Sequence, residues 1–324
     1  MERLDAFMAR AAAAYYARGD VFGRGGDFIT APEISQAFGE CLGLWAAVSW
    51  QAMGAPARVI LAELGPGRGT LMADALRAVR EAMPAFAAAA EVHLIEASPA
   101  LRAVQARRVP DATWHGGIDT LPPGPAVILA NEFFDALPIR QFVRRGAGWT
   151  ERFVAGGTFA EQAAPDQGEA PEGTVREVSE ASLALAASLA RRLAARGGAA
   201  LILDYGPAGS GFGDTLQALR GHERADPLAA PGTVDLTAHV DFAALAAAAR
   251  HAGAATHGPL PMGVFLQRLG LMARSAILAR MAPAQAGLIL SGAQRLVAPE
   301  GMGRLFKALC IAHPALPSPA GFEP

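Results

Sequence analysis

The chain has 324 residues, of which 52% are hydrophobic and 18% charged, and 28 Lys+Arg against 30 Asp+Glu leave a formal charge of −2. This composition excludes an intrinsically disordered protein and suffices for a large buried core, in one decorated domain or two. The near balance of charge excludes a strong electrostatic field for nucleic acid.

The first fifty residues predict a helix, a glycine-rich loop at Gly23–Asp27 and a second helix. The second helix carries an apolar stripe from Ile34 to Ala52, with residues spaced alternately by four and three. Thr30 and Glu33 have the spacing of a capping box that begins this helix.

From Ala57 onward, short apolar segments that predict strands alternate with segments that predict helices. The predicted strands lie at 59–64, 92–96, 112–115, 126–130, 201–204 and 305–311, and the predicted helices at 71–83, 99–108, 175–195, 242–250, 263–281 and 284–296. A hairpin of 141–143 with 151–154, followed by a loop at 163–174, separates the fourth and fifth strands. Continuous apolar strands between helices indicate an α/β fold with a parallel sheet covered on both faces.

A glycine-rich turn connects the first strand to the helix that follows it. It reads Glu63-Leu64-Gly65-Pro66-Gly67-Arg68-Gly69-Thr70. Glycines let the backbone approach a ligand closely, and a helix N-terminus favours hydrogen-bond acceptors. The G-x-G-x-G spacing differs from the dinucleotide pattern G-x-G-x-x-G and indicates a small adenosine ligand. A purely structural turn is the alternative reading.

Two further groups of polar residues follow strands. Glu96 ends the second strand, where a carboxylate can bind both ribose hydroxyls or else cap the helix that begins at Ser98. Asn131-Glu132-Phe133-Phe134-Asp135-Ala136-Leu137-Pro138 follows the fourth strand. Ligands of open α/β sheets bind beyond the carboxyl ends of strands, so this segment predicts a site for a cationic substrate. A helix start stabilised by its acids is the alternative reading.

These segments resemble the successive signatures of the MidA-type family of class I S-adenosylmethionine-dependent methyltransferases, which includes a mitochondrial complex I assembly methyltransferase. The matching blocks are Gly26–Ser35, Glu63–Leu71, Asn131–Pro138, Asp204–Gly206, Gly213–Leu216, Asp235–Phe242 and Met302–Lys307. The resemblance implies a seven-stranded sheet with a late antiparallel strand at 305–311. It also implies S-adenosylmethionine as cofactor and a protein arginine as acceptor, with a respiratory-complex subunit as one candidate.

The resemblance also implies roles for individual residues. Gly65, Gly67 and Gly69, with Glu63 and Thr70 in the same turn, would bind the methionine and ribose end of the cofactor. Glu96 would hold the ribose, and 114–119, which includes Ile118, would flank the adenine. Asn131 and Glu132 would lie near the transferred methyl group.

Methyl transfer to arginine needs a carboxylate that orients the guanidinium and takes its proton. Glu132 and Asp135 are the predicted catalytic pair, with Glu33 and Asp204 as weaker candidates. The histidines lack metal-ligand spacing, so we expect no metal. Two alternatives stay open: a catalytically idle assembly factor on the same scaffold, and a nicotinamide-dependent dehydrogenase.

The expected organisation is an N-terminal helical cap (1–54), a methyltransferase core (55–258) with an inserted hairpin (139–174), and a C-terminal segment (259–324) that completes the core. Two cysteines cannot build a disulfide framework, which indicates a reducing compartment. No uninterrupted apolar run reaches the roughly 18–20 residues that span a bilayer. We therefore expect a cytoplasmic protein without stable membrane insertion and without a nucleic-acid partner.

Overall fold

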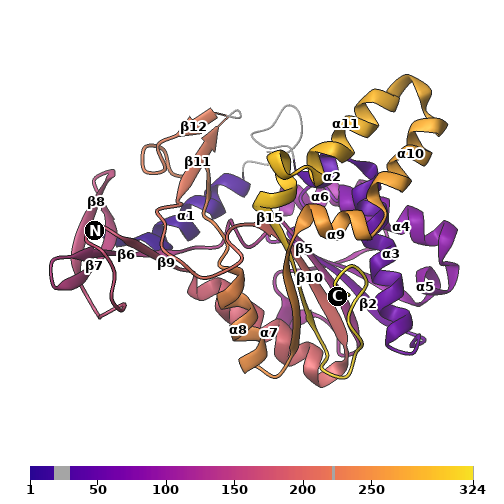
Figure 1. Cartoon of the computed structure of the whole chain (residues 1–324), viewed down its shortest axis with the longest axis horizontal. Coiled ribbons are helices and arrows are strands. Elements are labelled where there is room, and N and C mark those ends of the chain that lie inside the picture. The colour runs from indigo at the N-terminus through magenta and orange to yellow at the C-terminus, as the bar shows by residue number, and fades with distance from the viewer. Residues whose placement is uncertain (18–29, 221–222, 324) are drawn as a thin grey trace.

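A computed structural model describes residues 1–17, 30–220 and 223–323 (Figure 1). The helices are α1 (Leu4–Tyr16), α2 (Ala31–Ile34), α3 (Gln36–Ala52), α4 (Thr70–Ala82), α5 (Pro84–Ala89), α6 (Pro99–Arg108), α7 (Glu180–Arg196), α8 (Phe242–His251), α9 (Met262–Arg268), α10 (Leu271–Met281) and α11 (Ala286–Val297). The strands are β1 (Glu2–Arg3), β2 (Val59–Leu64), β3 (Ala90–Ile95), β4 (Thr113–His115), β5 (Ala126–Asn131), β6 (Arg140–Arg145), β7 (Gly148–Ala155), β8 (Thr158–Ala164), β9 (Val175–Val178), β10 (Gly198–Tyr205), β11 (Gln217–Arg220), β12 (Glu223–Ala225), β13 (Asp235–Thr237), β14 (Ala255–Pro261) and β15 (Phe306–Ala312). The predicted loop at Gly23–Asp27 lies outside the described residues.

The centre of the molecule is a seven-stranded sheet in the order β14-β15-β10-β5-β2-β3-β4. The pairs from β10 through β5, β2 and β3 to β4 are parallel. Strand β15 is antiparallel to both of its neighbours. The predicted α/β class and the late antiparallel strand are therefore confirmed.

Alternating residues of the strands face two helical layers. Leu61 and Leu201 belong to a core shared with α3, α4, α9 and α11. Ile60 and Ile202 belong to a second core, shared with α7 and α8. Because both faces are covered, the central strands are mainly apolar, as expected for parallel strands, and Glu63, Asn131 and Asp204 lie near their carboxyl ends.

A second sheet, β1-β7-β6-β9 with β8 on β7, projects from the central sheet (Figure 1). Helix α1 packs between this sheet and β11–β13 through Leu4, Phe7 and Met8. The inserted hairpin was predicted, whereas β8, β9, β11, β12 and β13 were not.

The structure corrects two predicted helices. The predicted helix 175–195 begins instead at Glu180, because Val175–Val178 pairs with β6 and the Ser179 hydroxyl accepts the N–H of Ser182 at 3.2 Å. The predicted helix 263–281 is two helices, since Gly270 adopts φ +81° between α9 and α10.

Strand β14 was missed because two prolines and a glycine interrupt it. It pairs with β15 through an irregularity between His257 and Leu260. The expected division at residue 258 falls inside β14, so the three-part organisation stays a prediction.

The predicted apolar stripe lies on α3. Its residues Phe38, Cys41 and Trp45 are buried, but Val48 is 45% exposed.

Candidate functional site

A cavity of about 540 Å³ lies beyond the carboxyl ends of β2, β3 and β5. Strand β2 is followed along the chain by β3 and β4 on one side of the sheet, whereas β5 lies on its other side. The cavity therefore lies where the strand order reverses, which is the usual ligand position in open α/β sheets. Its volume is that of a small-molecule site.

The glycine-rich turn forms one wall of the cavity. Gly65, Gly67 and Gly69 have φ values of +60°, +52° and +77°, a region that L side chains rarely adopt. A Cβ atom at Gly65 would lie 2.6 Å from Cδ2 of Phe133. Gly65 and Gly67 line the cavity, whereas Gly69 does not and faces Gln105 instead.

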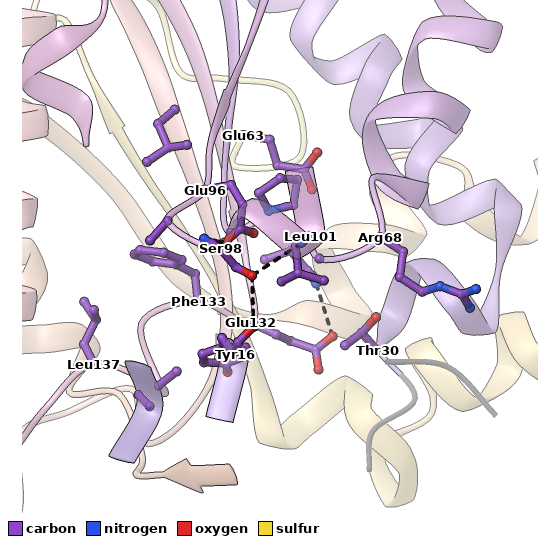
Figure 2. A pocket seen from close by; sticks show the side chains of 18 of the residues that line it. Tyr16, Thr30, Glu63, Arg68, Glu96, Ser98, Leu101, Glu132, Phe133 and Leu137 are labelled. Carbon is purple, nitrogen blue, oxygen red and sulfur yellow. Dashed lines mark hydrogen bonds between the residues drawn. The ribbon is translucent and has the colours of Figure 1, made fainter. Parts of the chain in front are cut away.

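Glu96 lines the cavity at the end of β3 (Figure 2). Its Oε1 accepts the N–H of Ser98 at 2.8 Å, and its Oε2 accepts Nε2 of Gln105 at 3.1 Å. Burial raises the pKa of Glu96. The helix cap is the Ser98 hydroxyl, which accepts the N–H of Leu101 at 3.4 Å. Glu96 is therefore held in place at the cavity wall without serving as the cap of α6.

Two buried polar atoms beside the cavity have no hydrogen-bond partner among the described residues. They are Oε2 of Glu63 and Oδ1 of Asn131, and both residues line the cavity. Burial raises the pKa of Glu63 to about 8. Unsatisfied buried acceptors are costly, so a ligand that carries N–H or O–H donors would relieve this cost. An S-adenosylmethionine molecule, with an ammonium group and ribose hydroxyls, has such donors and fits the donor requirement of this wall.

Glu132 follows β5 with φ +50°, an unusual conformation for a residue with a side chain. Its Oε1 accepts the backbone N–H of Ala31 at 2.8 Å and Nδ2 of Asn131 at 3.1 Å. Burial raises the pKa of Glu132. This carboxylate thus lies in the cavity and also caps the N-terminus of α2.

The predicted capping box at Thr30 is therefore wrong. The Thr30 side chain makes no capping hydrogen bond within the described chain. The Glu33 carboxylate accepts the hydroxyl of Thr70 instead of turning back to Thr30. Arg108 Nη1 donates to the same Thr70 hydroxyl at 2.5 Å.

Asp204 orders the segment after β5. Its Oδ2 accepts the backbone N–H groups of Phe133, Phe134 and Asp135 at 3.1, 2.8 and 3.3 Å, and its Oδ1 accepts that of Tyr205 at 2.9 Å. Asp204 is fully buried, and burial raises its pKa to about 7.

Asp135 does not line the cavity, contrary to the expected pairing with Glu132. Burial and the nearby Asp204 carboxylate raise the pKa of Asp135 well above its usual range. Because the Asp135 side chain is buried outside the cavity, it cannot contact a guanidinium bound there.

The structure brings seven of the predicted site residues together around one cavity. They are Glu63, Gly65, Gly67, Thr70, Glu96, Asn131 and Glu132. The other three lie elsewhere: Gly69 is the residue before α4, Asp135 is buried beside Asp204, and Ile118 is 8% exposed in the core shared with α7 and α8. Of the segment 114–119, Gly116 lines the cavity.

Helix α1 lies in the expected N-terminal cap and supplies a cavity wall whose residues the sequence analysis did not single out. Ala9, Ala12, Ala13 and Tyr16 line the cavity. The carbonyl oxygen of Tyr16 accepts the Ser98 hydroxyl at 2.9 Å, which joins α1 to the start of α6. The run of alanines in α1 was the available signal, because small side chains leave room beneath a helix.

Four carboxylates line the cavity: Glu33, Glu63, Glu96 and Glu132. Arg68 is the one cationic side chain among the lining residues that the structure describes. Even with Glu63 protonated at neutral pH, the acidic groups outnumber the cationic one, which favours a cationic ligand. In the same described ranges, no group of three or more potential ligand side chains could hold a metal ion.

Comparison with known proteins identifies relatives of this chain. A family described as "putative S-adenosyl-L-methionine-dependent methyltransferase" matches residues 41–260. The Drosophila melanogaster protein arginine methyltransferase NDUFAF7 homolog, mitochondrial, is 38% identical over 92% of this chain and 78% of its own length. The Homo sapiens protein arginine methyltransferase NDUFAF7, mitochondrial, is 34% identical over 96% of this chain and 79% of its own length.

A solved structure of similar fold comes from Burkholderia thailandensis and contains bound S-adenosyl-homocysteine. It is 27% identical, with a TM-score of 0.81, over 99% of this chain and 88% of its own. These findings favour neither the dehydrogenase nor the idle assembly factor.

The expected cytoplasmic location is contradicted, because the relatives are named mitochondrial. As for membranes, the helices within the described ranges are each too short or too polar to cross a bilayer alone. The pair α9 and α10, bent by 65° where the helices meet, is long and apolar enough to cross a bilayer only when the two are taken together, by length and composition alone.

Proposed function

The chain belongs to this family of S-adenosyl-L-methionine-dependent methyltransferases, and we propose that it methylates an arginine side chain of a protein. A respiratory-complex subunit is the acceptor that the family resemblance suggests. The names of the relatives support an arginine acceptor, and the acidic cavity wall supports a cationic one.

The proposed cofactor site consists of residues on the β2 and β3 side of the cavity. Gly65 and Gly67 would allow close approach to the backbone, Glu96 would accept the ribose hydroxyls, and Glu63 with Asn131 would accept N–H or O–H donors. When bound, S-adenosylmethionine supplies an electrophilic methyl group on a sulfonium. Holding two reactants in line can contribute on the order of 7–11 kcal/mol to a displacement.

The single observation that carries the proposed chemistry is the arrangement of the Glu132 carboxylate. Within the described ranges, both hydrogen bonds to the Glu132 carboxylate, from Ala31 and Asn131, go to Oε1, which leaves Oε2 to accept a guanidinium N–H. An arginine side chain has a pKa above about 12 and must lose one proton when a new N–C bond forms. The raised pKa of Glu132 makes its carboxylate a better acceptor for that proton.

The Glu132 side chain is held by two neighbours before any substrate arrives, which reduces the cost of orienting it. Phe133, Leu137 and Pro138, which follow Glu132 in the wall, would pack against the aliphatic part of the acceptor side chain. The acidic end and the apolar wall together match an arginine better than a small neutral acceptor.

The test is transfer of a labelled methyl group from S-adenosylmethionine to proteins of a cell lysate by the purified chain. Acid hydrolysis of the labelled protein should release methylarginine, and mass spectrometry should identify the acceptor. Glu96→Ala, with its weakened cofactor site, is the matched control and should give little label. Label recovered in lysine, or in a non-protein fraction, would overturn the arginine proposal.

A further inference from the structure

Gln105 is a fully buried polar residue on α6 that does not line the cavity. Its side chain lies between three segments that form the proposed cofactor site. Nε2 donates to the Gly67 carbonyl at 2.8 Å and to Oε2 of Glu96 at 3.1 Å. Oε1 accepts the indole N–H of Trp114 at 2.8 Å.

The orientation of this amide follows from the chemistry of its neighbours. An indole N–H can only donate, so the amide oxygen must face Trp114. The two amide hydrogens then point toward the Gly67 carbonyl and the Glu96 carboxylate, since a carbonyl oxygen and an ionised carboxylate can only accept hydrogen bonds. All the polar atoms of Gln105 are thereby used, and the amide cannot flip without losing several hydrogen bonds.

The consequence for Glu96 is that both of its oxygens are fixed. Ser98 holds Oε1 and Gln105 holds Oε2, so the carboxylate cannot rotate away from the cavity. The same amide holds the carbonyl of Gly67, whose φ is +52°. Gln105 therefore joins the glycine turn after β2 to the carboxylate after β3.

We propose that Gln105 is a positioning residue for the cofactor, setting the Glu96 carboxylate and the Gly67 carbonyl in the geometry that binds adenosine. This inference rests on the proposed cofactor site. Trp114 completes the arrangement, because its indole fixes the amide orientation and couples the site to β4. A binding group held by such a neighbour pays less conformational entropy when its ligand arrives.

Gln105→Met tests the proposal, because methionine keeps the length and burial of the side chain but removes its hydrogen bonds. We expect the Kd for S-adenosylmethionine and S-adenosylhomocysteine, measured by calorimetry, to rise about 10- to 100-fold. In turnover, KM for the cofactor should rise by the same factor, while kcat at saturating cofactor stays within about twofold. A merely structural role would lower the melting temperature but would leave the cofactor Kd and KM unchanged relative to kcat.

Gln141 offers a matched control. It is also fully buried, and its Nε2 donates to Glu177 at 2.7 Å and Asp214 at 2.9 Å while its Oε1 accepts from Arg152 at 2.9 Å. It lies on β6, in the projecting sheet rather than at the cavity. Gln141→Met should therefore destabilise the protein by a similar mechanism and leave the cofactor Kd within about twofold.

Two further variants give the test a firm outcome. Trp114→Phe keeps an aromatic ring but removes the indole N–H, and should raise the cofactor Kd even if Gln105→Met does not fold. In a Glu96→Gln background, Gln105→Met should raise the cofactor Kd by a much smaller factor than in the wild type, since the partner of Gln105 is already altered. A folded Gln105→Met protein, or Trp114→Phe in its place, with an unchanged cofactor Kd would overturn the positioning role. An unchanged Kd in Glu96→Ala would instead overturn the proposed cofactor site itself.

Discussion

Gly65→Ala is predicted to damage both the fold and cofactor binding, through one contact. The new Cβ would lie 2.6 Å from Cδ2 of Phe133 and 3.3 Å from Cε2, so the ring must move. Asp204 holds the backbone N–H of Phe133, and the Phe134 ring lies edge-on to the Phe133 ring with centroids 5.7 Å apart, which limits where the ring can move. Overpacking of this kind costs about 1–3 kcal/mol. Alanine at φ +60° adds a conformational cost of about 1–2 kcal/mol.

Gly54→Ala separates these two contributions. Gly54 has φ +83°, but nothing lies within 4 Å of its virtual Cβ, so alanine there bears only the conformational cost. In urea unfolding, the free energy of unfolding of Gly65→Ala should be lower than that of Gly54→Ala by about 1–3 kcal/mol, which is the contribution of the Phe133 contact. Calorimetry should show weakened S-adenosylmethionine binding for Gly65→Ala alone. Equal stabilities together with equal cofactor affinities would refute the close packing of Gly65 against Phe133.

Three other perturbations probe the buried titratable groups. Burial raises the pKa of Glu63 from 4.5 to about 8, so the folded state loses stability as pH rises through this window. Glu63→Gln should raise the free energy of unfolding in urea by about 2–4 kcal/mol over the wild type at pH 8, and by little at pH 4. Burial lowers the pKa of His93 in the folded state, so stability should decline as pH falls below 6.5; His93→Asn should flatten this decline in melting temperature. Asp204→Ala leaves four backbone N–H groups without their acceptor and should lower the free energy of unfolding by more than about 2 kcal/mol, whereas Asp204→Asn retains an acceptor and should lower it less.

Each of these expectations has an opposite outcome that would contradict it. A Glu63→Gln gain that is equal at both pH values would mean that the carboxyl is not protonated in the folded protein. An unchanged acid decline in His93→Asn would assign that decline to another group. Equal losses for the two Asp204 variants would mean that charge, rather than an acceptor, orders the segment after β5.

The central sheet was predictable because its signal is local. Strands β2, β3, β5 and β10 are short apolar runs, and the glycine turn and Glu96 directly follow two of them. Parallel strands bring their carboxyl ends to one edge of the sheet, so neighbours in space could be inferred from their positions in the chain. Strand β14 carried the opposite signal, because proline and glycine argue against a strand.

The details of the catalytic segment were not predictable, because they depend on contacts between distant residues. Glu132 caps α2 through Ala31, which is 101 positions away, and Asp204 holds Phe134 from 70 positions away. Glu132 and Asp135 were predicted as a catalytic pair because both follow the fourth strand, at the edge of the sheet where ligands bind. The positive φ of Glu132 and the pull of Asp204 on the next three N–H groups instead turn Asp135 away from the cavity.

The same geometry explains why Gln105 gave no signal. A glutamine in the middle of a helix usually faces solvent. Of its three partners, Gly67 follows β2, Glu96 follows β3 and Trp114 lies in β4. Its importance becomes visible only when the glycine turn, Glu96 and Trp114 are assembled around it.

The most direct test of the central claim is the rate of arginine methylation by Glu132→Gln on the identified acceptor. The amide keeps the side-chain volume and the oxygen that accepts from Ala31, but it cannot take up the guanidinium proton. We predict a cofactor Kd close to that of the wild type and a single-turnover rate lower by about 10²–10⁴. A folded Glu132→Gln protein that methylates arginine at the wild-type rate would contradict the account.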